Sequence, residues 1–188
     1  MDKKKILIVS AVFYPGNSPR ANRTTELAKE FAAQGHDVTV LTPRNEQFHP
    51  ELEKKHNFKI KDLGQPKWKA IQVKGSGLTS LLRRIASRLA SLLFEFPIIE
   101  YMGMVKHALK KESGYDLMIS IAVPHSVHWG TAKARTKKHR IAKIWATDCG
   151  DPFMLEKTDT FRKPFYFKSL EKEFCKKADF ITVPTEAS

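Results

Sequence analysis

The chain has 188 residues, of which 41% are hydrophobic and 28% are charged. These fractions are typical of a globular protein and exclude a wholly disordered or collagen-like chain. Only two cysteines occur, which excludes a small secreted domain framed by disulfides. The 33 Lys and Arg residues exceed the 20 Asp and Glu residues, and the net charge of +13 predicts an anionic partner. Nucleic acid, a membrane surface and a phosphorylated ligand all satisfy that condition.

The first residues do not have the pattern of a targeting signal. Three lysines precede an apolar run that stops at Val12 and meets Tyr14-Pro15-Gly16, which is typical of a buried strand entering a loop. No apolar run in the sequence approaches the roughly 20 residues that span a bilayer. Together with the cysteine usage, this pattern predicts a cytoplasmic protein in a reducing compartment.

The first 42 residues predict a βαβ unit. The run KILIVS at Lys5–Ser10 is continuously apolar, like a strand buried on both faces of a parallel sheet. Ser18 and Pro19 are typical of a helix start, and Gly35 is placed to end that helix. The run HDVTVLT at 36–42 predicts a second strand.

The same alternation recurs in the second half of the chain. The pattern predicts strands over Tyr115–Ile121, 141–147 and 178–184, and helices over 126–137 and 163–177. Alternating strands and helices predict an α/β fold with a doubly wound, Rossmann-like parallel sheet and right-handed crossovers.

Two stretches interrupt this alternation. Residues 45–77 are polar with strand-like pieces at 58–60 and 70–73, which predicts an elaborated loop or an edge strand. Residues 78–111 form one helical stretch that Pro97 is expected to split into two helices.

Doubly wound sheets bind ligands at the carboxyl ends of their strands, so the loops there carry the candidate residues. Gly16, Asn17 and Arg20 adjoin a helix N-terminus, which favours phosphate, although Asn17 could equally satisfy its own turn. The loop lacks the G-x-G-x-x-G of a dinucleotide site, and the sequence has no P-loop motif. Arg44 would suit a 2′-phosphate, but without those glycines we expect no nicotinamide cofactor.

Two later loops add further candidates. His125 is predicted to bind a sugar hydroxyl or to act in acid–base chemistry, and Ser126 either binds substrate or caps a helix. Asp148 and Asp151 are predicted to bind sugar hydroxyls or to supply a base, with turn-forming roles as the alternative. His125 and His128 lie three residues apart, but without a third ligand we expect no metal.

Residues 78–96 have a basic amphipathic pattern. Leucines recur on one face of the predicted helix, while Arg83, Arg84 and Arg88 lie towards the other side. This pattern predicts a membrane-surface element, and the alternative is an ordinary surface helix packed on the sheet. A second basic run at 133–140 belongs to no recognition module, so we expect no nucleic-acid partner.

The ordered motifs resemble the N-terminal half of GT-B-fold glycosyltransferases of family 4, in particular bacterial members that build polysaccharides. The shared segments in the first half are the strand at Ile6, the YPG loop, Gly35-His36 and the strand VTVLT. The shared segments in the second half are Asp116, Ser120, the PHS-x-H motif at 124–128, the D-x-G-D-P-F motif at 148–153, and Glu171 followed by ADFITV. The family pattern has arginine and tryptophan where this chain has Gly150 and Phe153.

This resemblance implies a metal-independent glycosyltransferase with a nucleotide-sugar as donor substrate, no tightly bound cofactor and a glycan or lipid-linked acceptor. Residues 1–188 would form the single acceptor-binding domain, with His125 and Asp151 on acceptor hydroxyls. The donor-binding C-terminal domain would be absent from this chain, which alone should be inactive. Family members often bind the inner face of the cell membrane, which agrees with the arginine-rich stretch. The competing hypotheses are a stand-alone basic module for membrane or nucleic acid and an NADP-dependent enzyme.

Overall fold

The computed structural model describes residues 2–72, 77–150, 153–154 and 163–183. Over these residues, parallel strands form one sheet in the order β3-β2-β1-β4-β5-β6. The strands are β1 (Lys5–Ser10), β2 (Asp37–Thr42), β3 (Lys59–Asp62), β4 (Tyr115–Ile121), β5 (Ala142–Asp148) and β6 (Phe180–Thr182). Strands are added outward in both directions from the β1–β4 pair, which is the doubly wound arrangement. The predicted fold class is therefore confirmed.

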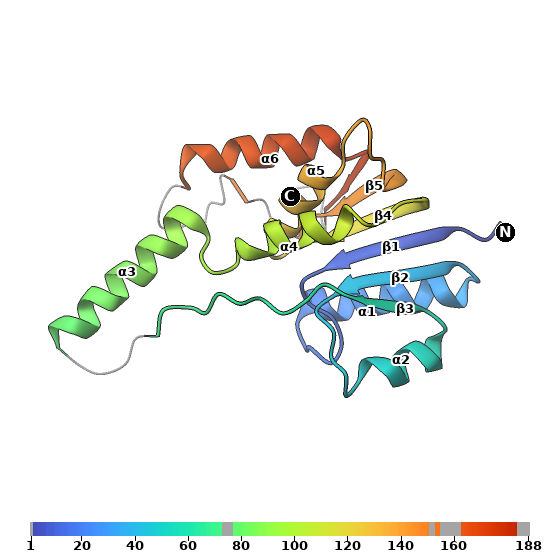
Figure 1. Ribbon diagram of the computed structural model, residues 1–188, viewed down its shortest axis with the longest axis horizontal. Coiled ribbons are helices and arrows are strands. Elements are labelled where there is room, and N and C mark those ends of the chain that lie inside the picture. Colours follow the sequence, from blue (N-terminus) through green and yellow to red (C-terminus); the bar gives the residue numbers. More distant parts are fainter. Residues whose placement is uncertain (1, 73–76, 151–152, 155–162, 184–188) are drawn as a thin grey trace.

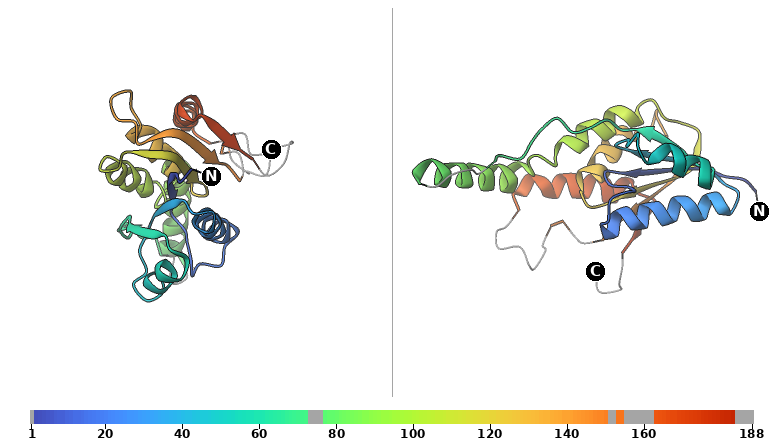
Figure 2. Two further views of the ribbon diagram at one scale, coloured as in Figure 1. Left: turned by 90° about the vertical axis from the view of Figure 1, so that its right-hand side faces the viewer. Right: turned by 90° about the horizontal axis from the view of Figure 1, so that it is seen from below.

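Helices cover both faces of this sheet. They are α1 (Pro19–Ala33), α2 (His49–His56), α3 (Leu78–Phe94), α4 (Glu100–Leu109), α5 (Ser126–Ala134) and α6 (Phe165–Lys177). Helices α1 and α2 lie on one face, and α4, α5 and α6 lie on the other (Figure 1). Helix α3 instead extends away from the body of the molecule, as both Figure 1 and the right-hand view of Figure 2 show.

The core lies on both sides of β1, because side chains alternate across a strand. Leu7 and Val9 pack into the cluster formed with α4, α5 and α6, whereas Ile6 and Ile8 pack with α1 and α2. All four side chains are at most 2% exposed. Burial on both faces explains why this strand is a continuous apolar run.

The predicted signals around α1 are present in the structure. Ser18 is the N-cap, and its Oγ accepts a hydrogen bond of 3.1 Å from the Ala21 backbone N–H. Pro19 is the first helical residue. Gly35 follows the helix with a φ of +88°, a left-handed conformation that glycine adopts without a steric penalty.

The irregular stretches differ in part from the prediction. Residues 45–77 contain α2, which was not predicted, and β3, which is an edge strand paired in parallel with β2. Residues 70–72 form no strand, and Val73 lies outside the described residues. The split around Pro97 is confirmed, since α3 ends at Phe94 and α4 begins at Glu100.

Helices α4 and α5 are in close contact. A Cβ atom at Gly130 would lie 2.7 Å from the Met102 carbonyl oxygen and 2.8 Å from Val105 Cβ, so only glycine fits there. The Ser126 hydroxyl donates to the Ile98 carbonyl oxygen at 2.9 Å, just before α4. At the other end of α4, the ring of His139 donates from Nε2 to the Leu109 carbonyl oxygen at 3.1 Å. These contacts hold α4 against α5 and against the loop that follows α5.

Candidate functional site

The order of the strands makes the β1–β4 pair the switch point of the sheet. The connections from these two neighbours run to opposite sides, and ligands of doubly wound sheets bind outside the carboxyl ends at such a point. Ser10 and Ile121, the last residues of β1 and β4, are register partners. The loops that carry Gly16 and His125 therefore leave the sheet side by side.

A cavity of about 440 Å³ lies at the carboxyl ends of β1 and β2. Gly16 and Asn17 form part of one wall, and Thr42, Arg44 and His49 form part of another. Its volume falls in the range of about 300–1,000 Å³ that is usual for ligand pockets. The Thr42 hydroxyl is buried and makes no hydrogen bond within the described part of the chain. Because Thr42 is 0% exposed, this oxygen lies behind the cavity wall.

His49 fixes the loop that follows β1. Its Nε2 lies 2.6 Å from the Tyr14 carbonyl oxygen, and its Nδ1 lies 3.1 Å from the Asn45 backbone N–H. Because a carbonyl only accepts and an N–H only donates, Nε2 carries the proton and Nδ1 accepts. The ring also meets Phe13 edge-on at 5.4 Å between centroids. His49 was not among the residues predicted to form the site. Its only distinguishing feature in the sequence is its position at the start of a short polar segment.

Gly16 forms the tight turn at the end of that loop. Its N–H donates to the Phe13 carbonyl oxygen at 2.9 Å, and a Cβ atom would lie 2.9 Å from the same oxygen. A side chain therefore cannot be accommodated without opening the turn. Because Gly16 has no side chain, its backbone forms part of the cavity wall, next to the exposed Asn17.

Asp148 connects α1 to the strands β5 and β6. Both carboxylate oxygens accept from Arg23 Nη1, at 2.8 and 2.9 Å, and Oδ1 also accepts from the Thr182 hydroxyl at 3.2 Å. A Cβ atom at Gly150 would lie 3.0 Å from Arg20 Nη2, so Arg20 lies over the loop after β5. The structure thus brings the predicted residues Arg20 and Asp148 to one edge, and it adds Arg23, which the sequence analysis missed.

His125 and Ser126 begin α5 at this same edge. His125 is the N-cap residue, is 7% exposed, and has its ring centroid 5.2 Å from that of Phe153. Ser126 is not the helix cap, since its hydroxyl bonds to the segment before α4. Asp151, the other predicted catalytic residue, lies outside the described residues.

His128 belongs to a buried network rather than to a metal site. The Trp145 indole N–H donates to Ser120 Oγ at 2.9 Å, and Ser120 in turn bonds His128 Nδ1 at 2.8 Å. His128 Nε2 lies 3.6 Å from Cys149 Sγ. Burial, with the nearby His125 second, lowers the pKa of His128 to about 3. Burial likewise raises the pKa of Cys149 to about 11, so the pair is neutral and does not form a thiolate nucleophile.

Two further predictions concern cofactors and metals. The Arg44 guanidinium bonds Glu46, Glu53 and the Ile60 carbonyl oxygen, so it holds α2 against β3. Within residues 2–72, 77–150, 153–154 and 163–183, no group of three or more His, Cys, Asp or Glu residues is placed to hold a metal ion. These observations add no support to a 2′-phosphate or a metal site.

Arg83, Arg84 and Arg88 lie on α3, away from the cavity. All three are exposed, and the leucines of the same helix are exposed as well: Leu81 is 52%, Leu82 57% and Leu89 50%. The helix therefore does not pack its apolar face on the sheet. No helix in the part of the chain that the structure describes has the length and apolar character needed to cross a bilayer.

Solved structures of low similarity include three different enzymes. The calicheamicin glycosyltransferase CalG4 is 18% identical with a TM-score of 0.42, over 92% of this chain and 35% of its own. Yeast methylglyoxal/isovaleraldehyde reductase Gre2, solved with NADPH, is 12% identical with a TM-score of 0.46, over 94% and 53%. The C-terminal domain of a Pyrococcus furiosus hydrogenase is 16% identical with a TM-score of 0.33, over 67% and 79%. All three scores are below 0.5, and we base no functional argument on them.

The comparison with family models gives a clear result, although no curated protein matches the chain. The chain spans about a third of the length of CalG4 and about half that of Gre2. The model described as "Glycosyl transferase 4-like domain" matches residues 21–188, which is most of the chain and leaves out β1 and the loop that carries Gly16. The chain therefore belongs to the family of glycosyl transferase 4-like domains.

Proposed function

We propose that this chain supplies the acceptor-binding part of a glycosyltransferase that moves a sugar from a nucleotide-sugar to a polysaccharide or lipid-linked acceptor. The observation that carries the proposal is the cavity at the carboxyl ends of β1 and β2 in a member of this family. The product would be a surface polysaccharide such as a capsule. The donor would be held mainly by a further domain, with no tightly bound cofactor in this one.

The residues at the carboxyl edge have the chemistry for this role. Asn17 is exposed at the cavity and offers an amide that can donate to and accept from sugar hydroxyls. Arg20 adds a positive charge near the Gly16 loop, where the donor diphosphate would approach. The His125 imidazole is suited to accept a proton from an acceptor hydroxyl as that oxygen attacks the sugar. Asp151 stays a predicted partner in that step.

Binding and turnover measurements test this proposal. Saturation-transfer NMR with a panel of mono- and disaccharides should detect binding, and Asn17→Ala and Arg20→Ala should each weaken it. Arg140→Ala is the matched control, because Arg140 precedes β5 at the opposite edge of the sheet. Nucleotide release from nucleotide-sugars should be negligible for this chain alone. Rapid turnover by the 188-residue chain, or sugar binding that ignores both variants, would contradict the proposal.

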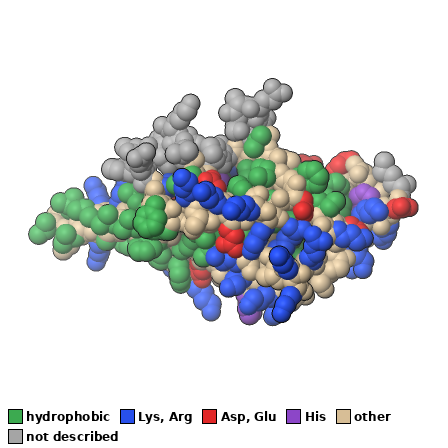
Figure 3. Space-filling view, turned by 90° about the horizontal axis from the view of Figure 1, so that it is seen from above, with side chains coloured by type: hydrophobic (Ala, Val, Ile, Leu, Met, Phe, Trp, Pro, Cys, Tyr) green, Lys and Arg blue, Asp and Glu red, His purple; other side chains and the backbone are tan. Residues whose placement is uncertain are grey.

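A second function, binding to an anionic membrane surface, is favoured by the exposed leucines and arginines of α3. Figure 3 shows apolar side chains along this helix with basic side chains at its margins. The enzyme would then act as a peripheral protein on the inner face of the cell membrane. The +13 charge would strengthen attraction to anionic lipids.

Vesicle co-sedimentation tests this second function. Binding should be strong with phosphatidylglycerol vesicles and weak with phosphatidylcholine vesicles, and it should decrease as salt is added. Replacing Arg83, Arg84 and Arg88 together with Gln should abolish most of it. Replacing the basic residues Lys137, Lys138 and Arg140 with Gln is the matched control. Equal losses from the two triple variants would show that net charge, and not α3, is responsible.

A further inference from the structure

The cavity at the carboxyl ends of β1 and β2 has few charged side chains in its wall. Among the described residues that line it, Arg44 alone carries a permanent charge. The His49 ring is neutral, because its Nε2 donates to the Tyr14 carbonyl oxygen and its Nδ1 accepts from the Asn45 N–H. The remaining polar side chains are neutral amides and hydroxyls, on Tyr14, Asn17, Ser18, Thr42, Asn45 and Gln65. The charge of a ligand that fits here therefore depends on the surroundings of Arg44.

Three carboxylates are bonded to Arg44. Its Nε donates to Glu46 at 3.1 Å, and its Nη2 donates to Glu53 at 3.0 Å. Its backbone N–H donates to Asp62 Oδ1 at 2.9 Å. The pKa of the guanidinium is raised, and the bond to Glu53 is the largest cause. One positive charge thus lies among three negative charges, so the group as a whole is acidic.

Glu53 is the carboxylate that compensates Arg44 most strongly. Its Oε1 accepts from the Ile60 backbone N–H at 2.6 Å, and this bond fixes the side chain while Oε2 accepts from Arg44. The side chains of Arg44 and Glu53 are each 23% exposed, so water and salt screen this pair only in part. Glu46 is 78% exposed, and its charge is screened far more. Glu53 therefore largely determines whether Arg44 attracts a further anion.

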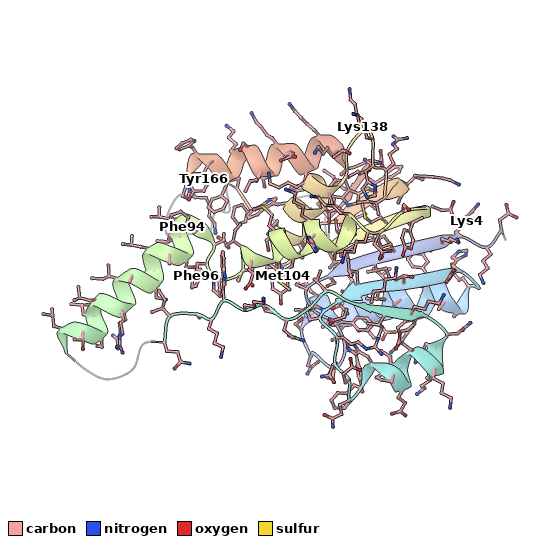
Figure 4. The ribbon with its side chains drawn as sticks, in the orientation of Figure 1. Lys4, Phe94, Phe96, Met104, Lys138 and Tyr166 are labelled. Carbon is pink, nitrogen blue, oxygen red and sulfur yellow. The ribbon has the colours of Figure 1, made fainter. Side chains whose placement is uncertain are left out.

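The start of α1 adds little attraction for an anion at this wall. An α-helix begins with N–H groups that lack partners inside the helix and favour anions. Here Pro19 has no N–H, and the Ser18 hydroxyl accepts from the Ala21 N–H. Arg20 is not among the described residues that line the cavity. Other basic residues lie away from it, and Figure 4 shows one of them, Lys138, on the opposite side of the molecule from α2.

These surroundings disfavour an anionic ligand and suit an uncharged one. A carboxylate or phosphate loses hydration when it enters a cavity, and only an uncompensated positive charge restores that loss. The amides of Asn17 and Gln65 can donate to and accept from hydroxyl groups, which carry no charge. Tyr14 is 40% exposed and adds apolar surface for the C–H groups of a sugar ring.

We propose that this cavity selects an uncharged sugar and that Glu53 determines this specificity. The inference rests on the proposed glycosyltransferase function and names the class of sugar at the acceptor end. That class is a neutral hexose or N-acetylhexosamine, as opposed to a uronic acid, a sialic acid or a sugar phosphate. While Glu53 is ionised, a further carboxylate near Arg44 is repelled. Without that charge, the guanidinium becomes a partner for a carboxylate.

Two matched pairs of methyl glycosides are the probes: methyl glucoside with methyl glucuronide, and methyl galactoside with methyl galacturonide. Within each pair the sugars differ only at C6, which is a hydroxymethyl group or a carboxylate. NMR titrations would follow the side-chain amides of Asn17 and Gln65, which line the cavity. The unaltered chain should bind a neutral sugar about tenfold more tightly than its acidic partner. Equal affinities within both pairs, or tighter binding of the acidic sugars, would overturn the proposal.

Glu53→Gln is the decisive variant. Glutamine keeps an oxygen for the Ile60 N–H but removes the charge, so the acidic sugars should gain about tenfold in affinity and the neutral sugars less than about twofold. Glu51→Gln removes the same charge from an exposed site on the same helix and should leave all affinities unchanged. If Glu53→Gln does not fold, Glu46→Gln is the second variant and should give a smaller gain, of about threefold. No gain in the variant that folds, or the same gain in Glu51→Gln, overturns the proposal.

Failure of the proposed function gives a different result. It would appear as the absence of binding between the unaltered chain and every neutral sugar tested. The role of Glu53 is judged separately, by the gain of binding to the acidic sugars in Glu53→Gln, which is measured whether or not a neutral sugar binds.

Discussion

Apolar side chains have opposite environments in the sheet and in α3. In β1, Leu7 and Ile8 are 0% exposed and pack against helices on both faces, whereas Leu82 and Leu89 of α3 are 57% and 50% exposed. The buried set stabilises the fold by leaving water. The exposed set contributes little to folding within the described chain, so its apolar area remains available for a lipid or another partner.

Two serines of α3 are less exposed than its leucines. Ser80 is buried and Ser87 is partly buried, and they lie two turns apart on one side of the helix. Ala90 and Phe94 lie towards this same side and line one apolar cavity, and Phe94 is 60% exposed. The exposed apolar side chains of α3 therefore lie on more than one side of the helix.

The largest loss of stability should come from a substitution among the buried side chains. Trp129 is 1% exposed and its ring contacts Phe153 and Phe167. Trp129→Ala should lower the free energy of unfolding by about 3–5 kcal/mol, because it removes a large buried side chain and leaves a cavity. Urea denaturation measures the loss. Trp68→Ala is the control, since it removes the same atoms from a half-exposed site and should cost far less.

A smaller loss is expected where α4 and α5 are in contact. Gly130→Ala forces a methyl group against the Met102 carbonyl oxygen and Val105, and it should cost about 1–3 kcal/mol of unfolding free energy. Gly103→Ala makes the same change on the exposed side of α4, where nothing lies within 4 Å of the new atom. That control should be neutral or slightly stabilising, because alanine favours helices. Thermal unfolding of both variants is the measurement, and equal losses would contradict the packing argument.

His128 should make the folded body sensitive to acid. Its pKa of about 3 in the folded chain is below the ordinary 6.5, so the unfolded chain binds the proton more tightly. Stability is therefore fully present above pH ~6.5 and decreases as the pH falls towards 3. Between pH 7.5 and 5.5 we expect a loss on the order of 1 kcal/mol from this residue.

Denaturation at several pH values measures this contribution. His128→Asn should flatten the pH dependence in that interval, even if the variant is less stable overall. His107→Asn replaces an exposed histidine of α4 and should keep the slope of the unaltered chain. If the slope survives in His128→Asn, another group is responsible for it.

The smallest effect on stability should come from substitutions of the exposed leucines of α3. Leu82→Gln and Leu89→Gln should change the unfolding free energy by about 0.5 kcal/mol or less, since glutamine has a similar helix propensity and no packing is lost. The same pair should clearly reduce co-sedimentation with phosphatidylglycerol vesicles. A large loss of stability would mean that these leucines are buried in solution, for example between two copies of the chain.

Local patterns predicted the elements that are buried on both faces. The bounds of β1 and β4 match their continuous apolar runs, and the cap at Ser18 follows from its neighbour Pro19. Helix α2 was missed because only its first residue and Leu52 are buried, so it has no apolar periodicity. Its own Glu53 holds it in place, since this carboxylate accepts from Arg44 at 3.0 Å and from the Ile60 N–H at 2.6 Å.

The candidate site was predictable as a set of loops but not as a set of contacts. The alternation of strands and helices places the residues after β1, β4 and β5 at one edge, and the structure confirms that placement. The pairing of Asp148 with Arg23 joins residues 125 positions apart, and local sequence carries no sign of it. The same is true of Ser126, whose partner Ile98 lies 28 positions away.

Gly130 also sets a separation between two helices. Helix α5 begins beside His125, and α4 lies against α5 at Gly130. The close approach of α4 to α5 therefore depends on a position where a hydrogen atom stands in place of a methyl group. The start of α5, with His125 at the carboxyl edge, is thus held against α4 by the interior of the domain, at a distance from the edge itself.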